Sequence, residues 1–153
     1  MKALGNHIKK HLKTARVMQL ATSLNDKPWV CNVHFYTDDD FNFYWISTQE
    51  RRHSQDIKEN PYVAATIKVH EDTSEEPYII GLSVEGKAEL IKENEAKKIA
   101  DKYKNKLGKP QSLIDDIFAG RNPHKFYRLK TEKFVLFDTK NFSDNPRQEY
   151  KIK

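Results

Sequence analysis

Three basic side chains follow closely on an aromatic segment in the first half of the chain. Arg51, Arg52 and His53 lie four to six residues after Ser47, which ends the run Phe-Asn-Phe-Tyr-Trp-Ile-Ser. Residues 47–50 read Ser-Thr-Gln-Glu, the S-x-x-E form of a capping box, which predicts that a helix begins there. The first turn of a helix has unpaired amides and a positive dipole end, so cations there are unfavourable unless an anion binds. The pattern therefore indicates a phosphate site at this turn.

A solvated surface is the alternative for this basic segment. Charge runs commonly face solvent, and the three side chains could simply spread into water. Ser47 likewise has two possible roles, because its hydroxyl could contact a ligand or cap the helix. Both alternatives stay open at the level of the sequence.

Two polar side chains on a neighbouring predicted strand could also line a binding site. Asn32 and His34 are two residues apart and therefore share one face of that strand. His34 could instead belong to a hydrogen-bonded network, and metal ligation is not expected, since His34 and His53 have no obvious third partner. No acid–base pair or activated nucleophile stands out, as is typical of proteins whose cofactor performs the chemistry.

The elements that position these residues are predicted from hydrophobic alternation and helix-stop signals. A strand over Phe41–Ile46 leads into the helix, Asn60-Pro61 ends that helix, and a second strand follows over Tyr62–Val69. Gly81 and Gly86, inside a later strand, indicate a bulge, a bend or a close approach of another group to the backbone. The other expected elements are helices over Lys2–Lys13, Glu93–Lys106 and residues 113–118, and strands over Val17–Leu24, residues 29–36, Tyr78–Ile91 and a closing hairpin of Phe126–Leu129 and Phe134–Asp138 around Thr131-Glu132.

These elements predict a mainly β fold. The first three strands are joined by short turns and are expected to form an antiparallel meander. Strands outnumber helices, which favours a small antiparallel β-barrel of about six strands with peripheral helices. We expect one domain over residues 1–153, with an N-terminal helix within residues 1–14 and a polar tail over 139–153. The last part of this tail, Asn141–Lys153, is expected to be loose unless a partner holds it.

Composition narrows the class of protein. The 153 residues are 37% hydrophobic and 32% charged, as expected for one well-charged domain with its own core. No apolar run reaches the ~20 residues of a membrane span, and the start lacks a signal-peptide core, so a cytoplasmic location is expected. The single cysteine, Cys31, excludes an internal disulfide. The net charge is +5, but the lysines are scattered, so nucleic acid is not an expected partner.

Four segments occur in an order and spacing that are typical of one known family. They read Phe-Tyr-Trp-Ile-Ser-Thr, Arg-Arg-His-Ser, Ile-Lys-Glu-Asn-Pro-Tyr-Val-Ala and Ser-Val-Glu-Gly-Lys-Ala-Glu, within about Val17 to Ile91. Together they resemble the pyridoxamine 5′-phosphate oxidase-like FMN-binding split-barrel family, and within it the YhbP-like branch. The resemblance implies a six-stranded antiparallel split barrel that holds FMN between the two subunits of a homodimer.

The resemblance also implies roles for individual residues, some for the phosphate of FMN and others for its isoalloxazine ring. At the phosphate, the implied residues are Ser47, Arg52 and His53, with the backbone of Ile46. Along the ring, they are Cys31, Asn32, Val33, His34 and Tyr36. In this assignment Arg52 and His53 neutralise the phosphate, and Ser47 forms a hydrogen bond to it.

Several positions depart from the pattern of the oxidases. The oxidases have Arg where this chain has Cys31, Lys at Tyr36 and at His53, and Gln near Gly81. Their C-terminal substrate-binding segment has no counterpart in Asn141–Lys153, so oxidation of pyridoxamine phosphate itself is not expected. The expected function is that of a flavin-dependent oxidoreductase, and the alternative is a non-catalytic barrel that binds haem, a deazaflavin or no cofactor.

Overall fold

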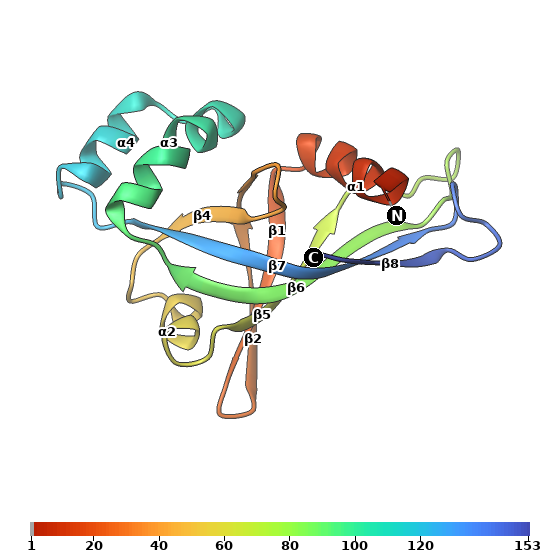
Figure 1. Cartoon of the computed structure of the whole chain (residues 1–153), viewed down its shortest axis with the longest axis horizontal. Helices are drawn as coiled ribbons and strands as arrows, with labels where there is room; N and C mark the ends of the chain where they lie inside the picture. The colour runs from red at the N-terminus through yellow and green to blue at the C-terminus, as the bar shows by residue number, and fades with distance from the viewer. Residues whose placement is uncertain (1) are drawn as a thin grey trace.

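A curled antiparallel sheet of eight strands forms the centre of the protein, as a computed structural model of residues 2–153 shows (Figure 1). The strands are β1 (Val17–Leu24), β2 (Lys27–His34), β3 (Tyr36–Thr37), β4 (Phe43–Ser47), β5 (Tyr62–Lys68), β6 (Ile80–Leu90), β7 (Lys125–Asp138) and β8 (Arg147–Lys151). The helices are α1 (Lys2–Thr14), α2 (Arg52–Glu59), α3 (Glu93–Leu107) and α4 (Gln111–Phe118). None of the helices in this range is long and apolar enough to cross a membrane.

The order of the strands shows that the sheet bends back on itself. The order is β2-β1-β5-β6-β7-β4-β3, with β8 paired to β7. Strands β2 and β3 follow each other directly in the chain but lie at opposite ends of this order, so the sheet must curl until its two ends approach. The helices lie around this half-barrel (Figure 1). The prediction of a mainly β split barrel with peripheral helices is therefore confirmed, with eight strands in place of six.

Alternation along β4 and β7 divides the buried side chains between two cores. Phe43 and Trp45 face the inside of the curl, where they pack with Leu20 and Leu129 in the main core. Tyr44, which lies between them in β4, faces the opposite side of the sheet and belongs to a second core beneath α3 and α4. The strand β4 is therefore covered on both faces, and this rigid position fixes the point at which α2 begins.

The predicted closing hairpin is wrong, because β7 runs without interruption from Lys125 to Asp138. The register between β6 and β7 shifts at Glu85/Gly86, where Gly86 pairs with Thr131 and Glu85 pairs with Lys133. The polar residues at Thr131-Glu132 thus mark a bulge and not a turn. The Thr131 hydroxyl is buried and donates to the Phe41 carbonyl at 2.6 Å, which compensates for its polarity. The close approach expected at Gly86 is confirmed, since a Cβ atom there would lie 2.1 Å from the Lys130 carbonyl oxygen.

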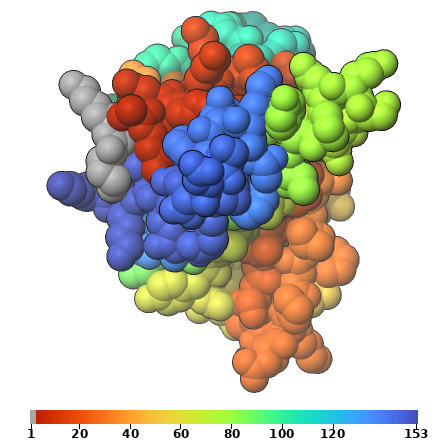
Figure 2. Space-filling model, turned by 90° about the vertical axis from the view of Figure 1, so that its right-hand side faces the viewer, coloured from red at the N-terminus to blue at the C-terminus, as the bar shows by residue number. Residues whose placement is uncertain are grey.

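The predicted meander holds only for its first two strands. β1 and β2 form an antiparallel hairpin whose turn residues, Asn25 and Asp26, adopt left-handed backbone geometry. β4 does not continue this hairpin, because it pairs with β7 and β3 at the far end of the sheet. The β1–β2 hairpin consequently projects away from the rest of the molecule (Figures 1 and 2).

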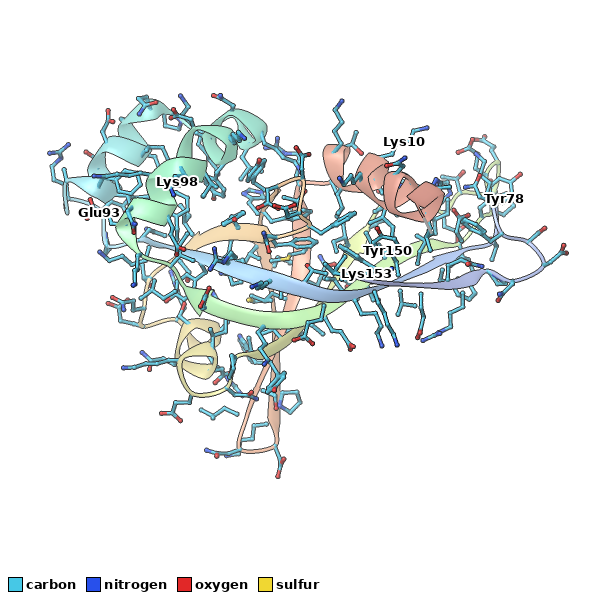
Figure 3. The ribbon with its side chains drawn as sticks, in the orientation of Figure 1. Lys10, Tyr78, Glu93, Lys98, Tyr150 and Lys153 are labelled. Atoms are coloured by element: carbon cyan, nitrogen blue, oxygen red, sulfur yellow. The ribbon has the colours of Figure 1, made fainter. Side chains whose placement is uncertain are left out.

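The prediction of a loose C-terminal tail is also wrong. Residues 147–151 form β8, which pairs with β7 from Phe137 to Lys133. Tyr150 anchors this strand, because its hydroxyl lies so close to Gly5 of α1 that a Cβ atom on Gly5 would be 2.7 Å away. Figure 3 shows Tyr150 beneath α1. The sequence of β8, Arg-Gln-Glu-Tyr-Lys, has no hydrophobic alternation, so this strand could not be predicted from the local pattern.

Candidate functional site

The basic turn, residues 51–53, connects β4 to α2. β4 extends to Ser47, whose pairing with Lys125 of β7 keeps it in an extended conformation. The helix begins at Arg52, its N-cap is Arg51, and no side chain in the described part of the chain caps it. The predicted capping box is therefore wrong, and the Ser47 hydroxyl instead donates to the Thr48 carbonyl at 3.2 Å. Because no side chain caps α2, the amides of its first turn are available to an anion.

Arg52 is held in place and does not spread freely into solvent. Its guanidinium lies 4.5 Å from the centre of the Trp29 ring, and its Nε is 4.0 Å from Oδ2 of Asp56. Asp56 is buried and accepts a hydrogen bond of 2.8 Å from the Thr22 hydroxyl. The side chain of Arg52 is still 46% exposed. An anion at this turn can therefore reach the guanidinium without displacing Trp29 from beneath it.

His53 carries a buried nitrogen without a partner. Only 8% of the residue is exposed, and Nε2 makes no hydrogen bond within the described part of the chain. A buried polar atom of this kind normally has a partner, since leaving one unpaired costs about 1–3 kcal/mol. Burial lowers the pKa of His53 below its ordinary value of 6.5, with a further lowering by Arg51 and a partial offset by Asp56. A phosphate oxygen is the kind of group that would fit this nitrogen, so the residues present are compatible with the phosphate of FMN.

Two serine hydroxyls lie beside the basic turn. Ser54 donates to Ser47 at 3.3 Å, and both residues are buried. A cavity of about 400 Å³ lies between α2 and the end of β6, and Ser54, Lys58 and Tyr127 contribute to its wall. Ser54 is thus shared by the basic turn and this cavity, although none of the predicted cofactor-binding residues lines the cavity itself.

The four predicted residues of β2 point to two different sides of the sheet. Cys31 and Val33 pack against the main core, whereas Asn32 and His34 lie on the outer face and are exposed. The amide of Asn32 accepts a hydrogen bond of 2.7 Å from Gln19, and burial is the main cause that lowers the pKa of His34. Burial raises the pKa of the Cys31 thiol, which makes this thiol unreactive. The shared face of Asn32 and His34 is confirmed.

The last two predicted residues lie in the second core. Tyr36 stacks on Tyr44 with ring centres 6.0 Å apart, and Ile46 packs in the same cluster beneath α3 and α4. No hydrogen bond within residues 2–153 joins Tyr36 to Ser47, Arg52 or His53. The structure thus brings Ser47 and the basic turn together but does not add Tyr36 to them.

Four residues around the basic turn were not predicted from the sequence. They are Thr22, Trp29, Ser54 and Asp56. Ser54 and Asp56 lie one and three positions after His53, so proximity in the helix was a usable signal. Thr22 and Trp29 belong to the β1–β2 hairpin, where they face each other across the strand pair, and no local pattern links them to α2.

Comparisons with known proteins agree on the fold. A conserved hypothetical protein from Mycobacterium tuberculosis superimposes with a TM-score of 0.74 at 18% identity, covering 90% of this chain and 86% of that chain. An FAD-binding protein from Mesorhizobium loti gives 0.63 at 19% identity over 84% and 90% of the two chains. HutZ, a haem storage protein from Vibrio cholerae, gives 0.62 at 19% identity over 83% and 89%. No curated protein matches the sequence.

A family model extends the agreement from the fold to the sequence. The model described as pyridoxamine 5′-phosphate oxidase matches residues 4–137, which include every strand from β1 to β6 and almost all of β7. The match spans the basic turn, the β1–β2 hairpin and both cores. The chain therefore belongs to the pyridoxamine 5′-phosphate oxidase family of split barrels.

Proposed function

We propose that this protein binds flavin mononucleotide in a homodimer and acts as a flavin-dependent oxidoreductase. In this proposal the phosphate lies at the basic turn, where Arg52 and His53 neutralise it and Ser47 forms a hydrogen bond to it. The isoalloxazine ring lies along β2, at residues 31–34. The FAD-binding neighbour from Mesorhizobium loti supports a flavin as the class of ligand.

The unpaired Nε2 of His53 is the observation that carries the proposal. It belongs to the first turn of α2, for which no side-chain cap is found among the described residues, and Arg51, Arg52 and Ser54 are its neighbours in the sequence. An anion would accept hydrogen bonds from the imidazole and the first-turn amides together, and Arg52 would add its charge. A single compact anion site of this kind suits a monophosphate.

The strand β2 supports the placement of the ring. Within residues 2–153 it pairs with β1 on one edge only, so the backbone groups of its other edge could bind a planar ligand with donors and acceptors along its rim. α2 packs against β1 and β2, and Arg52 contacts Trp29 of β2, so the phosphate and the ring could belong to one ligand. The second subunit would cover the ring from the open side.

The flavin would supply the hydride or electron transfer itself. The residues of this chain would bind and orient it, and Asp56 would keep Arg52 positioned when the phosphate is absent. The buried Thr22–Asp56 pair would in turn hold Asp56. No acid–base pair is needed from the protein for this role.

The direct test measures binding of FMN and of riboflavin, which lacks the phosphate, by calorimetry on flavin-free protein. We expect FMN to bind at least tenfold more tightly than riboflavin, because the basic turn contacts only the phosphate. We also expect FMN, and not riboflavin, to raise the melting temperature strongly. Equal affinity for the two compounds would remove the basic turn from the proposal.

Two arginine variants sharpen the test. Arg52→Ala should weaken FMN binding by about tenfold or more, since hydrogen bonds to charged groups contribute about 1.5–3 kcal/mol. Arg147→Ala is the matched control, because Arg147 is also partly exposed and pairs with Glu149 at 2.9 Å within β8. The absorption spectrum of freshly purified protein separates the cofactors, since a haem spectrum in place of a flavin spectrum would overturn the assignment.

A further inference from the structure

A second cluster of chemistry-bearing side chains lies at the other end of the molecule. His7 and His11 belong to α1, four residues apart and therefore on the same face of the helix. Asp138 ends β7, far along the chain, and meets this face. Figure 2 shows this side of the molecule, with α1 in red, the end of β7 in blue and the 70–80 loop in light green gathered together.

The ligand atoms of the cluster converge on one point. Nε2 of His7 lies 3.1 Å from Oδ2 of Asp138 and 3.3 Å from Nε2 of His11. All three ligand atoms lie within 4.8 Å of one another. Two ligands at the Zn–N and Zn–O bond lengths of a tetrahedral site are separated by about 3.3 Å. The separations of His7 Nε2 from Asp138 Oδ2 and from His11 Nε2 already match this value. A small rotation of His11 would bring its Nε2 to a similar distance from Asp138 Oδ2.

Hydrogen bonds alone do not account for both short contacts of His7 Nε2. An imidazole nitrogen has a single in-plane direction, occupied by a proton or by a lone pair. Nε2 of His7 therefore cannot make well-aligned bonds to Asp138 and to His11 at the same time. A cation at the point between the three atoms can accept a lone pair from each of them.

The carboxylate of Asp138 is oriented for this role. Oδ1 accepts the backbone amides of Lys140 and Asn141 at 3.0 and 2.9 Å, and Oδ2 accepts the Asn141 side chain at 2.8 Å. The side chain is fully buried, and its one ion pair among the described residues is with His7. Such outer hydrogen bonds commonly orient metal-binding carboxylates. A buried carboxylate also requires a positive partner, which a metal ion would provide.

We propose that His7, His11 and Asp138 bind a divalent transition-metal ion, with Zn²⁺ as the best match in ligand type and spacing. Two imidazoles and one carboxylate form a three-ligand set that leaves the fourth position to water or to another ligand. The edge of the Phe142 ring, with its centre 5.9 Å from that of His7, shields the cluster on one side.

The ion would fasten α1 to the sheet. α1 is the first element of the chain and covers the inside of the curl with Leu4, Ile8 and Leu12, while β7 is the longest strand. Lys10 projects from the outer side of the helix, away from the sheet (Figure 3). A metal link between α1 and β7 would therefore hold the N-terminal helix over the main core, independently of any flavin at the basic turn.

The test uses the full chain without a histidine tag, treated with a chelator and then passed through a desalting column. We expect the wild-type protein to retain one Zn²⁺ per chain after incubation with Zn²⁺ and a second desalting step. Free Zn²⁺ at about 100 times its dissociation constant should raise the melting temperature by about 5–10 °C. Cobalt(II) should give the visible spectrum of a low-coordinate site.

Four variants decide the assignment. His7→Ala and His11→Ala should lose the bound zinc and the thermal shift, whereas His124→Ala, a histidine that contacts Asn122, should keep both. His11→Cys should keep the metal and add a thiolate band to the cobalt spectrum. The proposal is overturned if wild-type protein retains no zinc, or if His7→Ala and His11→Ala retain it as well as His124→Ala does. FMN binding should be the same in all four variants, which separates this site from the basic turn.

Discussion

The unpaired imidazole nitrogen of His53 makes the stability of the protein sensitive to pH. Because burial lowers the pKa of His53 in the folded state, the folded protein resists protonation of this residue while the unfolded chain accepts it. The contribution of His53 to the free energy of unfolding is therefore fully present above its unfolded pKa, about 6.5. It is lost progressively as the pH falls through the folded pKa.

We therefore predict that the free energy of unfolding of the flavin-free protein falls between about pH 7.5 and about pH 5.5. In the variant His53→Gln part of this decrease should disappear, since glutamine does not titrate. Urea unfolding at the two pH values measures the difference. The two proteins are the same at every other position, so an identical pH dependence in wild type and variant contradicts the prediction.

The buried pair of Thr22 and Asp56 allows a second prediction. Thr22→Val removes the donor of the 2.8 Å hydrogen bond while conserving shape, and leaves the buried Oδ2 of Asp56 with only the 4.0 Å ion pair to Arg52. We expect a loss of about 1–3 kcal/mol in the free energy of unfolding. Thr66→Val is the control, because the Thr66 hydroxyl makes only an exposed contact of 3.4 Å with Gln19, so its effect should stay within about 0.5 kcal/mol. Equal losses in denaturant titrations of the two variants would contradict this account of Asp56.

At the scale of single residues, the sequence predicts a site formed by neighbouring residues but misses contacts between residues that are far apart in the chain. Arg52 and His53 could be placed at a helix start because charge, strand end and helix pattern are contiguous. The contacts of Arg52 with Trp29, and of Asp56 with Thr22, join residues more than twenty positions apart. The same applies to Asp138, although the four-residue spacing of His7 and His11 is visible in the sequence.

At the scale of elements, β6 offers a matched pair of glycines. A Cβ atom at Gly86 would lie 2.1 Å from a backbone oxygen of β7, whereas a Cβ atom at Gly81 would meet nothing within 4 Å. Gly86→Ala should therefore cost about 1–3 kcal/mol or more, since the clashing atom belongs to the backbone and cannot move aside. Gly81→Ala should change the free energy of unfolding by less than about 0.5 kcal/mol.

Chemical denaturation of the two glycine variants checks this prediction directly. Both substitutions add one methyl group to the same strand and change the unfolded chain equally, so the difference between them reports the bulge alone. A Gly86→Ala variant as stable as Gly81→Ala would show that β6 and β7 can separate at the bulge without loss.

The elements themselves were largely predictable, and the errors have a common cause. β1, β5 and α3 follow from alternation or helical periodicity within one segment, and their bounds differ little from those expected. The closing hairpin was mispredicted because a bulge and a turn favour the same polar residues. The capping box failed because the pairing of Ser47 with β7 outweighs the local preference for a helix start. In each case a long-range strand pairing overrides the local signal.

At the scale of the whole molecule, the open end of the sheet determines how the ligand site is completed. β2 is the terminal strand of the order, its hairpin projects from the body, and Val30 on its outer face is 59% exposed. A ring bound along this strand would be covered on one side only. The association of two chains, which would cover both hairpins, is therefore part of the proposed function and not a separate property.

We predict that Val30→Lys disrupts the proposed homodimer and weakens FMN binding at the same time, because a charge replaces an apolar side chain at the proposed interface. Ile79→Lys is the matched control, since Ile79 is 57% exposed but lies near Thr139, away from the hairpin. Sedimentation velocity measures the association, and FMN titration of the same samples measures the affinity. If Val30→Lys leaves both unchanged, the outer face of β2 is not the contact between subunits. If it abolishes association while FMN still binds with full affinity, one chain forms the whole site, and the ring must then lie on the side of β2 that faces α2.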